Sequence, residues 1–591
     1  MVQPRWDIQQ LTGEHESVRD RLAGQLHISK VSASLLVQRG LTTPEAARAF
    51  IAPRLEALHD PFLMRDMDKA VSRLRRAVEN GERILVYGDY DVDGTTAVAL
   101  VFSFLSRLPE YADGRAAALL DYYIPDRYQE GYGISFRGVD YAAETGSTLI
   151  IALDCGIRSV DKVDYARSKG IDFIICDHHL PGADIPSAVA VLDAKRADST
   201  YPYAELCGCG VGFKLVHAYI QQCGLPSSLL EPLLEPVAMA IASDIVPVTG
   251  ENRILAYYGL KRINRAPSVG LESLLRVAGI EQGKVGIGDL VYKIGPRINA
   301  CGRLKSGRDA VRLLVTTDPE EAQQMSSSIN ENNQARKDLD HDITEAAVAQ
   351  LKADPHNEER KTTVVCGKDW HKGVVGIVAS RLTEQWYRPT IVLTETDGIA
   401  SGSARSVGGF DIYSAIDSCS DLLTNFGGHV FAAGLSMKSE NVPLFKERFE
   451  AYVAAHILPE QLQPVIRVEA EICFADITAQ FFNILRHLEP FGPGNPCPVF
   501  VTRNVCNYRY TKRVGKQGEH LRLDVTDRTG ALSGIAFGRG NLAIDLMNGR
   551  NADLCYELHP NTFNGNTTIQ MMVQDIVMLP ESSTTCTPTA P

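Results

Sequence analysis

The sequence predicts an α/β protein with two α/β domains joined by a long helix and followed by a C-terminal β-barrel domain. Three short apolar runs, "ERILVYGD", "STLIIALDCG" and "IDFIICDHH", alternate with helical stretches, which is typical of βαβ units with a parallel sheet covered on both faces. Residues 318–354 contain no β-type run and predict one polar helix with acids near its start. After the Pro-rich "EPFGPGNPCPVF", β formers alternate between turns to about residue 580, which predicts a small barrel.

The same patterns give the expected domain boundaries. The second α/β block contains "TTVVCG", the helix-like "VVGIVASRLTEQ" and "TIVLTE", and we expect the Gly-rich stretches "SGSARSVGGF" and "FGGHVFAAG" to interrupt it. The expected parts are an N-terminal helical segment over 1–70, a first α/β domain over 71–317, the connecting helix over 318–354, a second and smaller α/β domain over 355–457, the β domain over 463–580 and a disordered tail over 581–591.

Composition is that of an ordinary globular protein. At 591 residues the chain is too long for one core, and it has no run approaching the roughly 18 apolar residues of a membrane-spanning helix. The start, "MVQPRWDIQQ", has no basic segment followed by an apolar one, so we expect no signal peptide, a cytoplasmic protein and reduced thiols for its 13 cysteines. The net charge of −12 weakens the case for a polyanionic substrate without excluding one, because a phosphate-binding channel needs only local positive charge.

Residue types that ligate metals stand at the ends of the apolar runs. Three aspartates alternate in "DYDVDG", and further acids and histidines follow "LIIAL", "FIIC" and the apolar segment "PVAMAIAS". These residues are Asp89, Asp91, Asp93, Asp154, Asp177, His178, His179 and Asp244. Because ligands bind outside the carboxyl ends of the strands of an open parallel sheet, neighbouring strands would bring all these side chains into one crevice.

Each of these residues has a plainer explanation when taken alone. The spacing of "DYDVDG" also opens an EF-hand calcium loop, but such a loop needs a helix before it and a bidentate Glu at its twelfth position. Here a β-type run precedes it and the twelfth residue is Leu100. Asp154 is explained equally well as the N-cap of a following helix. Asp244 alone favours a cap or turn, and the two histidines alone suggest one packed ring and one exposed ring.

Taken together, these residues favour a metal centre. Several unpaired carboxylates in one crevice would repel each other and raise each other's pKa, and a pair of divalent cations removes that cost. Mixed Asp and His ligation suits Mn²⁺, with Mg²⁺ or Zn²⁺ as alternatives. The residues therefore predict a two-metal phosphoester hydrolase.

The motifs resemble, in order, those of a known enzyme family. "DYDVDG", "LDCG", "CDHH" and "ASDIVP" are similar to the four successive motifs of the DHH phosphoesterases, and "GGHVFAAG" resembles the hallmark of the associated DHHA1 domain. "RGLTTPEAARAF", "RINACGRL", "DWHKGVVGIVASRL" and "PFGPGNPCPVF" resemble the members that degrade single-stranded DNA. The resemblance covers about residues 25–580. It departs at Asp193, where such sequences show an Asn-Pro pair, and this affects only a local turn.

The resemblance implies a role for each ligand position. The implied metal ligands are Asp89 and Asp91 for one ion, Asp93, His178 and Asp244 for the other, and Asp154 as the bridge. It makes His179 the contact to the scissile phosphate or the leaving oxygen, and Asp177 the residue that orients a histidine. The sequence shows no separate general base. None is needed, because metal-bound hydroxide can act as the nucleophile near neutral pH.

Two groups of residues are weaker candidates for substrate contacts. Arg297, Asn299 and Arg303 in "RINACGR" would hold phosphate oxygens, because Arg offers a bidentate fork. A structural Arg paired with an acid explains them equally well. His371 in "DWHKG" and Arg405 in "GSARS" are further candidates.

The second half of the chain adds two candidate DNA contacts. Gly427 and Gly428 would let the backbone approach a phosphate or a 5′ end, with His429 completing the pocket. In 503–522, six basic residues stand against one acid, with tyrosines among them, as a single-strand platform requires. A solvated hairpin is the plainer explanation, but the resemblance, which implies an OB fold here, favours the platform. Its candidate residues are Tyr508, Tyr510, Lys512 and Arg513.

The resemblance implies a metal-dependent exonuclease, using Mn²⁺ or Mg²⁺, that degrades single-stranded DNA 5′→3′ into 5′-mononucleotides in recombination and repair. The implied partners are single-stranded DNA, a single-strand-binding protein and a helicase; we expect a monomer with no membrane association. One alternative is a phosphodiesterase for nanoRNA or cyclic dinucleotides, which would need no extended C-terminal platform. The other is a non-catalytic replication scaffold of the same fold, although here every ligand position is filled.

Overall fold

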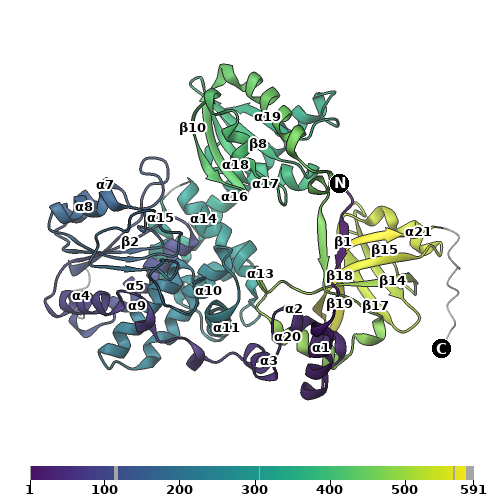
Figure 1. Ribbon diagram of the computed structural model, residues 1–591, viewed down its shortest axis with the longest axis horizontal. Coiled ribbons are helices and arrows are strands. Elements are labelled where there is room, and N and C mark those ends of the chain that lie inside the picture. The colour runs from purple at the N-terminus through teal and green to yellow at the C-terminus, as the bar shows by residue number, and fades with distance from the viewer. Residues whose placement is uncertain (1, 112–117, 305, 564–565, 581–591) are drawn as a thin grey trace. The chain divides into compact units, whose positions relative to one another are not determined.

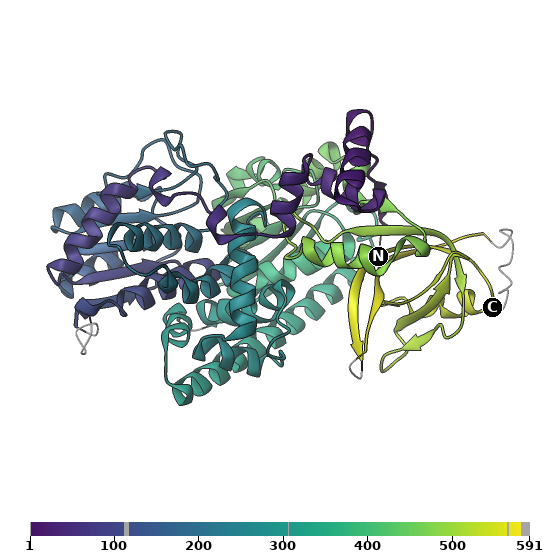
Figure 2. The ribbon, with the colours of Figure 1, turned by 90° about the horizontal axis from the view of Figure 1, so that it is seen from below.

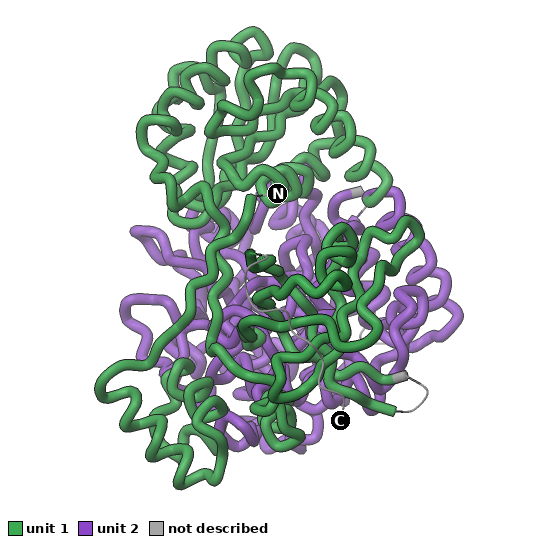
Figure 3. The backbone as a smooth tube through the Cα atoms, turned by 90° about the vertical axis from the view of Figure 1, so that its right-hand side faces the viewer, with its two compact units in different colours: residues 1–48, 337–487, 497–591 green, residues 49–336, 488–496 purple. Residues whose placement is uncertain are grey.

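The chain folds into two compact units (Figure 3). The computed structural model describes residues 2–111, 118–304, 306–563 and 566–580, so the predicted disordered tail, 581–591, lies outside the described residues. Unit 1 comprises residues 1–48, 337–487 and 497–591, and unit 2 comprises residues 49–336 and 488–496.

Unit 2 is built on a five-stranded sheet in which all neighbouring strands are parallel. In spatial order the strands are β3 (Leu120–Tyr123), β2 (Ile84–Gly88), β4 (Leu149–Leu153), β5 (Asp172–Cys176) and β6 (Ala190–Leu192). The three apolar runs form β2, β4 and β5, which confirms the predicted parallel sheet. Because β3 is added on one side of β2 and β4 on the other, the strand order reverses between β2 and β4, where open α/β sheets bind their ligands.

Helices cover both faces of this sheet (Figure 1). Successive side chains of β2 point to opposite faces: Ile84 and Val86 join one apolar core, and Leu85 and Tyr87 join the other. The first core contains α4 (Met67–Glu79), α5 (Val92–Leu105) and α9 (Gly208–Gln222), and the second contains α7 (Phe136–Glu144) and α8 (Val160–Ser168). The strands are therefore buried on both sides, as their near-continuous apolar sequences predict.

The rest of unit 2 is helical. The apolar segment "PVAMAIAS" forms a helix, α10 (Leu234–Ser243), so Asp244 is positioned by a helix end and not by a strand. The following helices are α11 (Gly250–Arg265), α12 (Val269–Val277), α13 (Ile287–Asp289), a π-helical turn (Leu290–Ile294), α14 (Gly295–Leu304) and α15 (Gly307–Val315). The predicted long helix is α16 (Pro319–Ala353), 35 residues that run from unit 2 into unit 1.

Unit 1 contains a second five-stranded sheet, flanked by α17 (Lys372–Trp386), α18 (Ile412–Asp417) and α19 (Val442–His456). Its spatial order is β10 (Leu423–His429), β11 (Ala432–Lys438), β9 (Ile399–Arg405), β8 (Thr390–Thr396) and β7 (Thr363–Lys368). Contrary to our expectation, the Gly-rich stretches do not interrupt this block: they form most of β9 and β10 and the start of β11. Glycine is used there for close packing of strands: a Cβ on Gly402 would lie 1.9 Å from the carbonyl oxygen of Val392.

The C-terminal part of unit 1 is a sheet of seven strands (Figures 1 and 2). They are β13 (Ala470–Glu471), β14 (Val499–Asn507), β18 (Ala552–Phe563), β19 (Asn566–Met578), β17 (Ala531–Ala536), β16 (His520–Thr526) and β15 (Lys512–Val514). Strand β14 also pairs with β16, so the pairings run from β14 through β18, β19, β17 and β16 back to β14. This closed circuit of five strands is the pairing pattern of a barrel. Two helices accompany it, α20 (Ala479–Leu488) and α21 (Ala543–Met547).

The N-terminal segment is mainly helical, with α1 (Glu14–Leu26), α2 (Lys30–Gln38) and α3 (Pro44–Ile51). The purely helical expectation for it was wrong at its start, because β1 (Arg5–Ile8) is a strand paired in parallel with β12 (Val465–Val468). The indole Nε1 of Trp6 also donates a hydrogen bond to Asp575, 3.0 Å away. A strand whose partner lies some 460 residues later leaves little local signal. Among the described residues, no helix combines the length and apolarity needed to cross a membrane.

Candidate metal centre

The carboxyl ends of three neighbouring strands of unit 2 carry the predicted ligands. Asp89 follows β2, Asp154 follows β4, and the sequence Asp177-His178-His179 follows β5. Because β2, β4 and β5 are adjacent and parallel, these side chains emerge at one edge of the sheet, at the reversal of strand order between β2 and β4.

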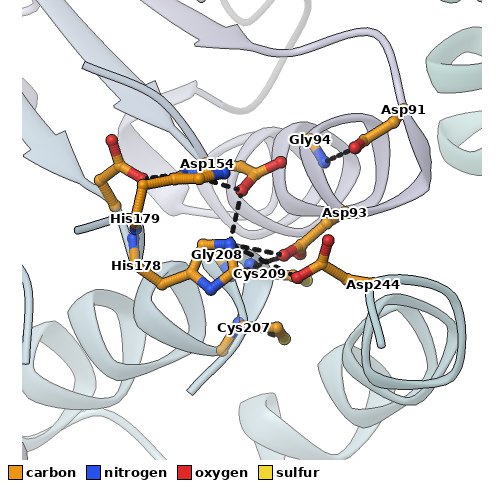
Figure 4. A network of polar contacts seen from close by, with 12 residues as sticks. Asp91, Asp93, Gly94, Asp154, His178, His179, Cys207, Gly208, Cys209 and Asp244 are labelled. Atoms are coloured by element: carbon orange, nitrogen blue, oxygen red, sulfur yellow. Dashed lines mark hydrogen bonds and ion pairs between the residues drawn. The ribbon is translucent and has the colours of Figure 1, made fainter. Parts of the chain in front are cut away.

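Helix N-termini hold two further aspartates (Figure 4). Asp91 is the N-cap of α5, where its carboxylate accepts a hydrogen bond from the amide of Gly94 at 3.0 Å. Asp93 lies in the first turn of α5 and is buried. Its two oxygens accept the amide N–H groups of Gly208 (2.6 Å) and Cys209 (2.7 Å) at the start of α9. Amides at a helix N-terminus stabilise a carboxylate, so the start of α9 favours the ionised form of Asp93 and fixes the orientation of its side chain.

His178 is the meeting point of the cluster (Figure 4). Its Nε2 atom lies 3.2 Å from Oδ1 of Asp154, 3.4 Å from Oδ2 of Asp244 and 3.9 Å from Oδ2 of Asp93. Asp93 lies in α5, and the other three side chains directly follow an element or lie close after it: Asp154 follows β4, His178 follows β5 and Asp244 follows α10. The structure therefore brings together four of the six predicted metal ligands around one imidazole. It also places Asp89 at the same sheet edge, with Oδ1 accepting the amide of Gly133 at 3.2 Å.

The protein alone does not stabilise so many buried acids as carboxylates. Burial and the neighbouring carboxylates raise the pKa of Asp93 to about 7 and that of Asp244 to about 9, and hold the pKa of Asp154 well above its usual range. Burial lowers the pKa of His178 to about 4, so its ring is neutral at physiological pH. A neutral imidazole is the form that ligates metals, whereas the carboxylates require a positive charge among them.

Unsatisfied polar atoms show where such charge would fit. Oδ1 of Asp154, Oδ2 of Asp89 and Nε2 of His178 are buried and have no hydrogen-bond partner among the described residues. Two overlapping groups have their ligand atoms within 4.8 Å of one another: Asp154, His178 and His179, and Asp93, His178 and Asp244. Carboxylate oxygens mixed with imidazole nitrogen suit Mn²⁺ and accommodate Mg²⁺. The residues present therefore fit a pair of divalent cations.

Asp177 orients His179 and not His178. Its Oδ1 lies 2.7 Å from Nδ1 of His179, and its Oδ2 accepts the amide of Ile157 at 2.9 Å. Burial is the largest single effect and opposes both charges, but the hydrogen bond between these side chains and the attraction between their charges, with smaller contributions from other neighbours, together outweigh it, lowering the pKa of Asp177 and raising that of His179. The contact through Nδ1 leaves Nε2 of His179 on the other side of the ring.

Tyr132 is a residue of this site that sequence reasoning missed. Its hydroxyl lies 3.0 Å from Nε2 of His179 and donates a hydrogen bond to the backbone oxygen of Asp154 at 3.1 Å, while its ring is 53% exposed. Gly131 and Gly133, which flank it, both have positive φ angles. The sequence "EGYGI" carried that signal, because two such glycines force a tight turn that presents the intervening side chain.

Gly208 was also missed. Besides donating to Asp93, it packs so tightly on Asp154 that a Cβ at this position would lie 2.6 Å from Oδ1 of Asp154. The "CGCG" stretch at 207–210 therefore contributes to the site through its backbone.

The other candidates of unit 2 lie on α14, outside both ligand groups. Arg297 donates to the side-chain oxygen of Asn330 (3.1 Å) and to the backbone oxygen of Lys293 (2.7 Å). Neither partner is an acid, so these two contacts of Arg297 are not the structural ion pair that was the alternative explanation. Asn299 and Arg303 are half-buried on the same helix.

The candidates of unit 1 lie in or next to its five-stranded and seven-stranded sheets. His371 is the N-cap of α17, with Nδ1 accepting the amide of Gly373 at 3.1 Å, and Arg405 ends β9, held by Ser403 Oγ at 2.7 Å. The remaining candidates are Gly427, Gly428 and His429, exposed on β10, Tyr508 and Tyr510 between β14 and β15, and Lys512 and Arg513, exposed on β15. Gly428 has a φ of 154°, and a Cβ there would lie 2.4 Å from the backbone oxygen of Ala432, so only glycine fits.

Comparison with known proteins agrees with this arrangement. Family models match three regions: the N-terminal domain of the DHH family at residues 83–241, the DHHA1 domain at 359–455 and the RecJ OB domain at 468–575. The chain is 35% identical to the single-stranded-DNA-specific exonuclease RecJ of Bacillus subtilis (97% of this chain, 70% of that one) and 33% identical to that of Escherichia coli (86% and 90%). The crystal structure of RecJ in complex with Mn²⁺ from Thermus thermophilus superposes with a TM-score of 0.81 at 28% identity, covering 98% of this chain and 80% of that one.

Proposed function

Because the chain belongs to the RecJ family of single-stranded-DNA-specific exonucleases, we propose that it degrades single-stranded DNA from the 5′ end into 5′-mononucleotides, using Mn²⁺ or Mg²⁺. The observation that carries this proposal is the convergence of Asp93, Asp154 and Asp244 on Nε2 of His178. A crowd of buried carboxylates around a neutral imidazole is costly on its own and suits a phosphodiester hydrolase that uses two cations.

The ligand residues divide the work of holding the cations. Asp154 would contact both cations, with Asp93, His178 and Asp244 completing the shell of one and Asp89 and Asp91 that of the other. When bound, the cations would activate the attacking water and offset charge on the scissile phosphate. The chain's own contribution is to fix the carboxylates in place, which the amides of α9 do for Asp93.

His179 acts on the phosphate or on the leaving oxygen. Its contact to Asp177 through Nδ1 helps to raise its pKa and orients the ring, so the protonated ring would serve as a proton donor. Tyr132, whose hydroxyl contacts that Nε2 atom, holds the ring from the solvent side.

The remaining candidates handle the DNA strand. Arg297, Asn299, Arg303, His371 and Arg405 would bind phosphate oxygens, since guanidinium groups recognise them through paired hydrogen bonds. The glycines of β10 have no side chain, so the DNA backbone could approach β10 closely next to His429. In the C-terminal domain, Tyr508 and the exposed Tyr510 would stack on bases, while Lys512 and Arg513 would track the phosphates.

We further propose a cytoplasmic monomer that acts in DNA recombination and repair with a helicase and a single-strand-binding protein. Such partners would supply and manage the single strand that the enzyme consumes.

A comparison of substrates tests the proposed function. Turnover is measured with Mn²⁺ on a long 5′-phosphorylated single strand, on the same strand in a blunt duplex, and on a dinucleotide. We expect the long single strand to be degraded fastest and the duplex to resist. A preference for the dinucleotide would instead support the small-substrate phosphodiesterase, and activity on no substrate would support the scaffold.

A further inference from the structure

A second group of metal-binding side chains lies in the C-terminal domain of unit 1. Sγ of Cys497, a carboxylate oxygen of Glu557 and a ring nitrogen of His559 all lie within 4.8 Å of one another. All three residues are half-buried, so the side chains are held by the fold while a small ion can still reach them. The proposed nuclease centre, which lies in unit 2, uses none of them.

The backbone brings these residues together. Glu557 and His559 are two apart in β18, so their side chains lie on the same face of the strand. In the antiparallel pairing of β14 with β18, Val499 is opposite Glu557. Cys497 lies two residues before the start of β14, and continuing this register would bring it opposite His559. Directly opposed residues on one face have Cβ atoms about 4.5–5.5 Å apart, which suits a shared ligand.

The surrounding contacts prepare the group for a cation. Nε2 of His559 lies 2.8 Å from Oε2 of Glu557, and the other carboxylate oxygen accepts a hydrogen bond from Nε2 of Gln574 at 2.7 Å. A neutral donor that holds a ligating carboxylate is what supporting residues of metal sites supply.

We propose that Cys497, Glu557 and His559 bind a zinc ion. Zinc accepts thiolate, imidazole and carboxylate together in a tetrahedral shell, with water in the fourth position. The thiolate sets this site apart from the carboxylate-rich centre of unit 2, because magnesium and manganese prefer oxygen ligands. The chain enters unit 1 at Cys497 after the 488–496 segment of unit 2. A zinc ion at Cys497 would therefore tie the residues just before β14 to β18.

Cobalt substitution tests the proposal on the full-length protein. Cobalt occupies zinc sites, and a thiolate ligand gives it an ultraviolet charge-transfer band that carboxylate and imidazole ligands do not give. We expect the band in the wild type, its loss in Cys497→Ser, and at least about tenfold weaker cobalt binding in His559→Gln. The band should survive in Cys473→Ser, a matched control because Cys473 is another half-buried thiol of the same unit.

Competition and zinc content complete the test. Added zinc should remove the cobalt band, whereas a large excess of magnesium should not. After equilibrium dialysis, the wild type should retain one zinc ion per chain more than Cys497→Ser. The proposal is wrong if the wild type shows no thiolate band, or if the band persists in Cys497→Ser. It is also wrong if His559→Gln, with an unchanged circular dichroism spectrum, binds cobalt as tightly as the wild type.

Discussion

Nε2 of His178 lies 3.2 Å from Oδ1 of Asp154, and neither atom has a hydrogen-bond partner among the described residues. Leaving buried polar atoms unpaired costs about 1–3 kcal/mol for each group, and more when one is charged. A divalent cation between the two atoms would bind both and remove this cost.

Replacing Asp154 should lower the hydrolytic activity and raise the stability of the metal-free protein. Asp154 has a positive φ of 58°, a conformation that Asn tolerates, so Asp154→Asn removes the charge without straining the backbone. We expect Mn²⁺-dependent hydrolysis to fall by about 10²-fold or more. The metal-free protein should melt at a higher temperature, because one of several repelling buried carboxylates is gone. A hydrolysis assay with Mn²⁺ checks the first effect and melting curves in EDTA check the second. A variant that stays active would show that Asp154 is not a ligand.

A glycine should be as important as the ligands themselves. A Cβ on Gly208 would lie 2.6 Å from Oδ1 of Asp154, so Gly208→Ala should displace Asp154 or the start of α9 and weaken Mn²⁺ binding. Titration calorimetry measures that loss. Gly24→Ala is the matched control: Gly24 is an exposed position in α1 with no atom within 4 Å of its added Cβ, so that change should stabilise the protein by about 0.5–1 kcal/mol. Equal Mn²⁺ affinity in both variants would refute the role of Gly208.

The metal-free protein should lose stability as the pH rises. In the folded state burial raises the pKa of Asp93 to about 7 and that of Asp244 to about 9, whereas unfolded aspartates titrate near about 3.9. Between these values the folded state binds more protons than the unfolded state, so each upward step in pH favours unfolding. Melting temperatures in EDTA from about pH 5 to pH 9 should fall, and the slope should be shallower in Asp244→Asn. A slope identical to that of the wild type would show that Asp244 is not one of the responsible groups.

The C-terminal domain should contribute binding more than chemistry. The ring of Tyr510 is 72% exposed, and loss of one stacked base costs about 1–3 kcal/mol. Tyr510→Ala should therefore weaken single-strand binding by roughly 5- to 150-fold at fixed salt, measured by fluorescence anisotropy in EDTA so that no cleavage occurs. Ile544→Ala, which removes an exposed apolar side chain of the same domain, should leave affinity unchanged. Equal losses in the two variants would argue against stacking by Tyr510.

Much of the nuclease centre follows from local sequence patterns. Apolar runs that end in Asp154 or in Asp177-His178-His179 predicted strands of a parallel sheet, and the geometry of such sheets predicted that these ends meet. The structure has that arrangement. The contribution of Asp244 was predicted only as the end of an apolar segment, because a short apolar run does not distinguish a strand from a buried helix.

What the sequence did not reveal depends on contacts between distant segments. The amides of Gly208 and Cys209 hold Asp93 from 115 and 116 residues away, and backbone donors leave no mark on residue identity. The pairing of β1 with β12 is equally non-local. The Gly-rich segments of β9 to β11 form strands although glycine has a low strand propensity. Neighbouring strands approach closely there, as at Gly402, and only the small glycine permits that approach.

Digestion of one single-stranded oligonucleotide, labelled at its 5′ end or at its 3′ end, tests the central claim most directly. With Mn²⁺, the wild type should release the 5′ label at once as a mononucleotide, while the 3′-labelled strand shortens step by step. Asp154→Asn should do neither. Release of the 3′ label first, internal cuts that leave both labels on long fragments, or unchanged digestion by Asp154→Asn would each contradict a 5′→3′ exonuclease built on the Asp154–His178 centre.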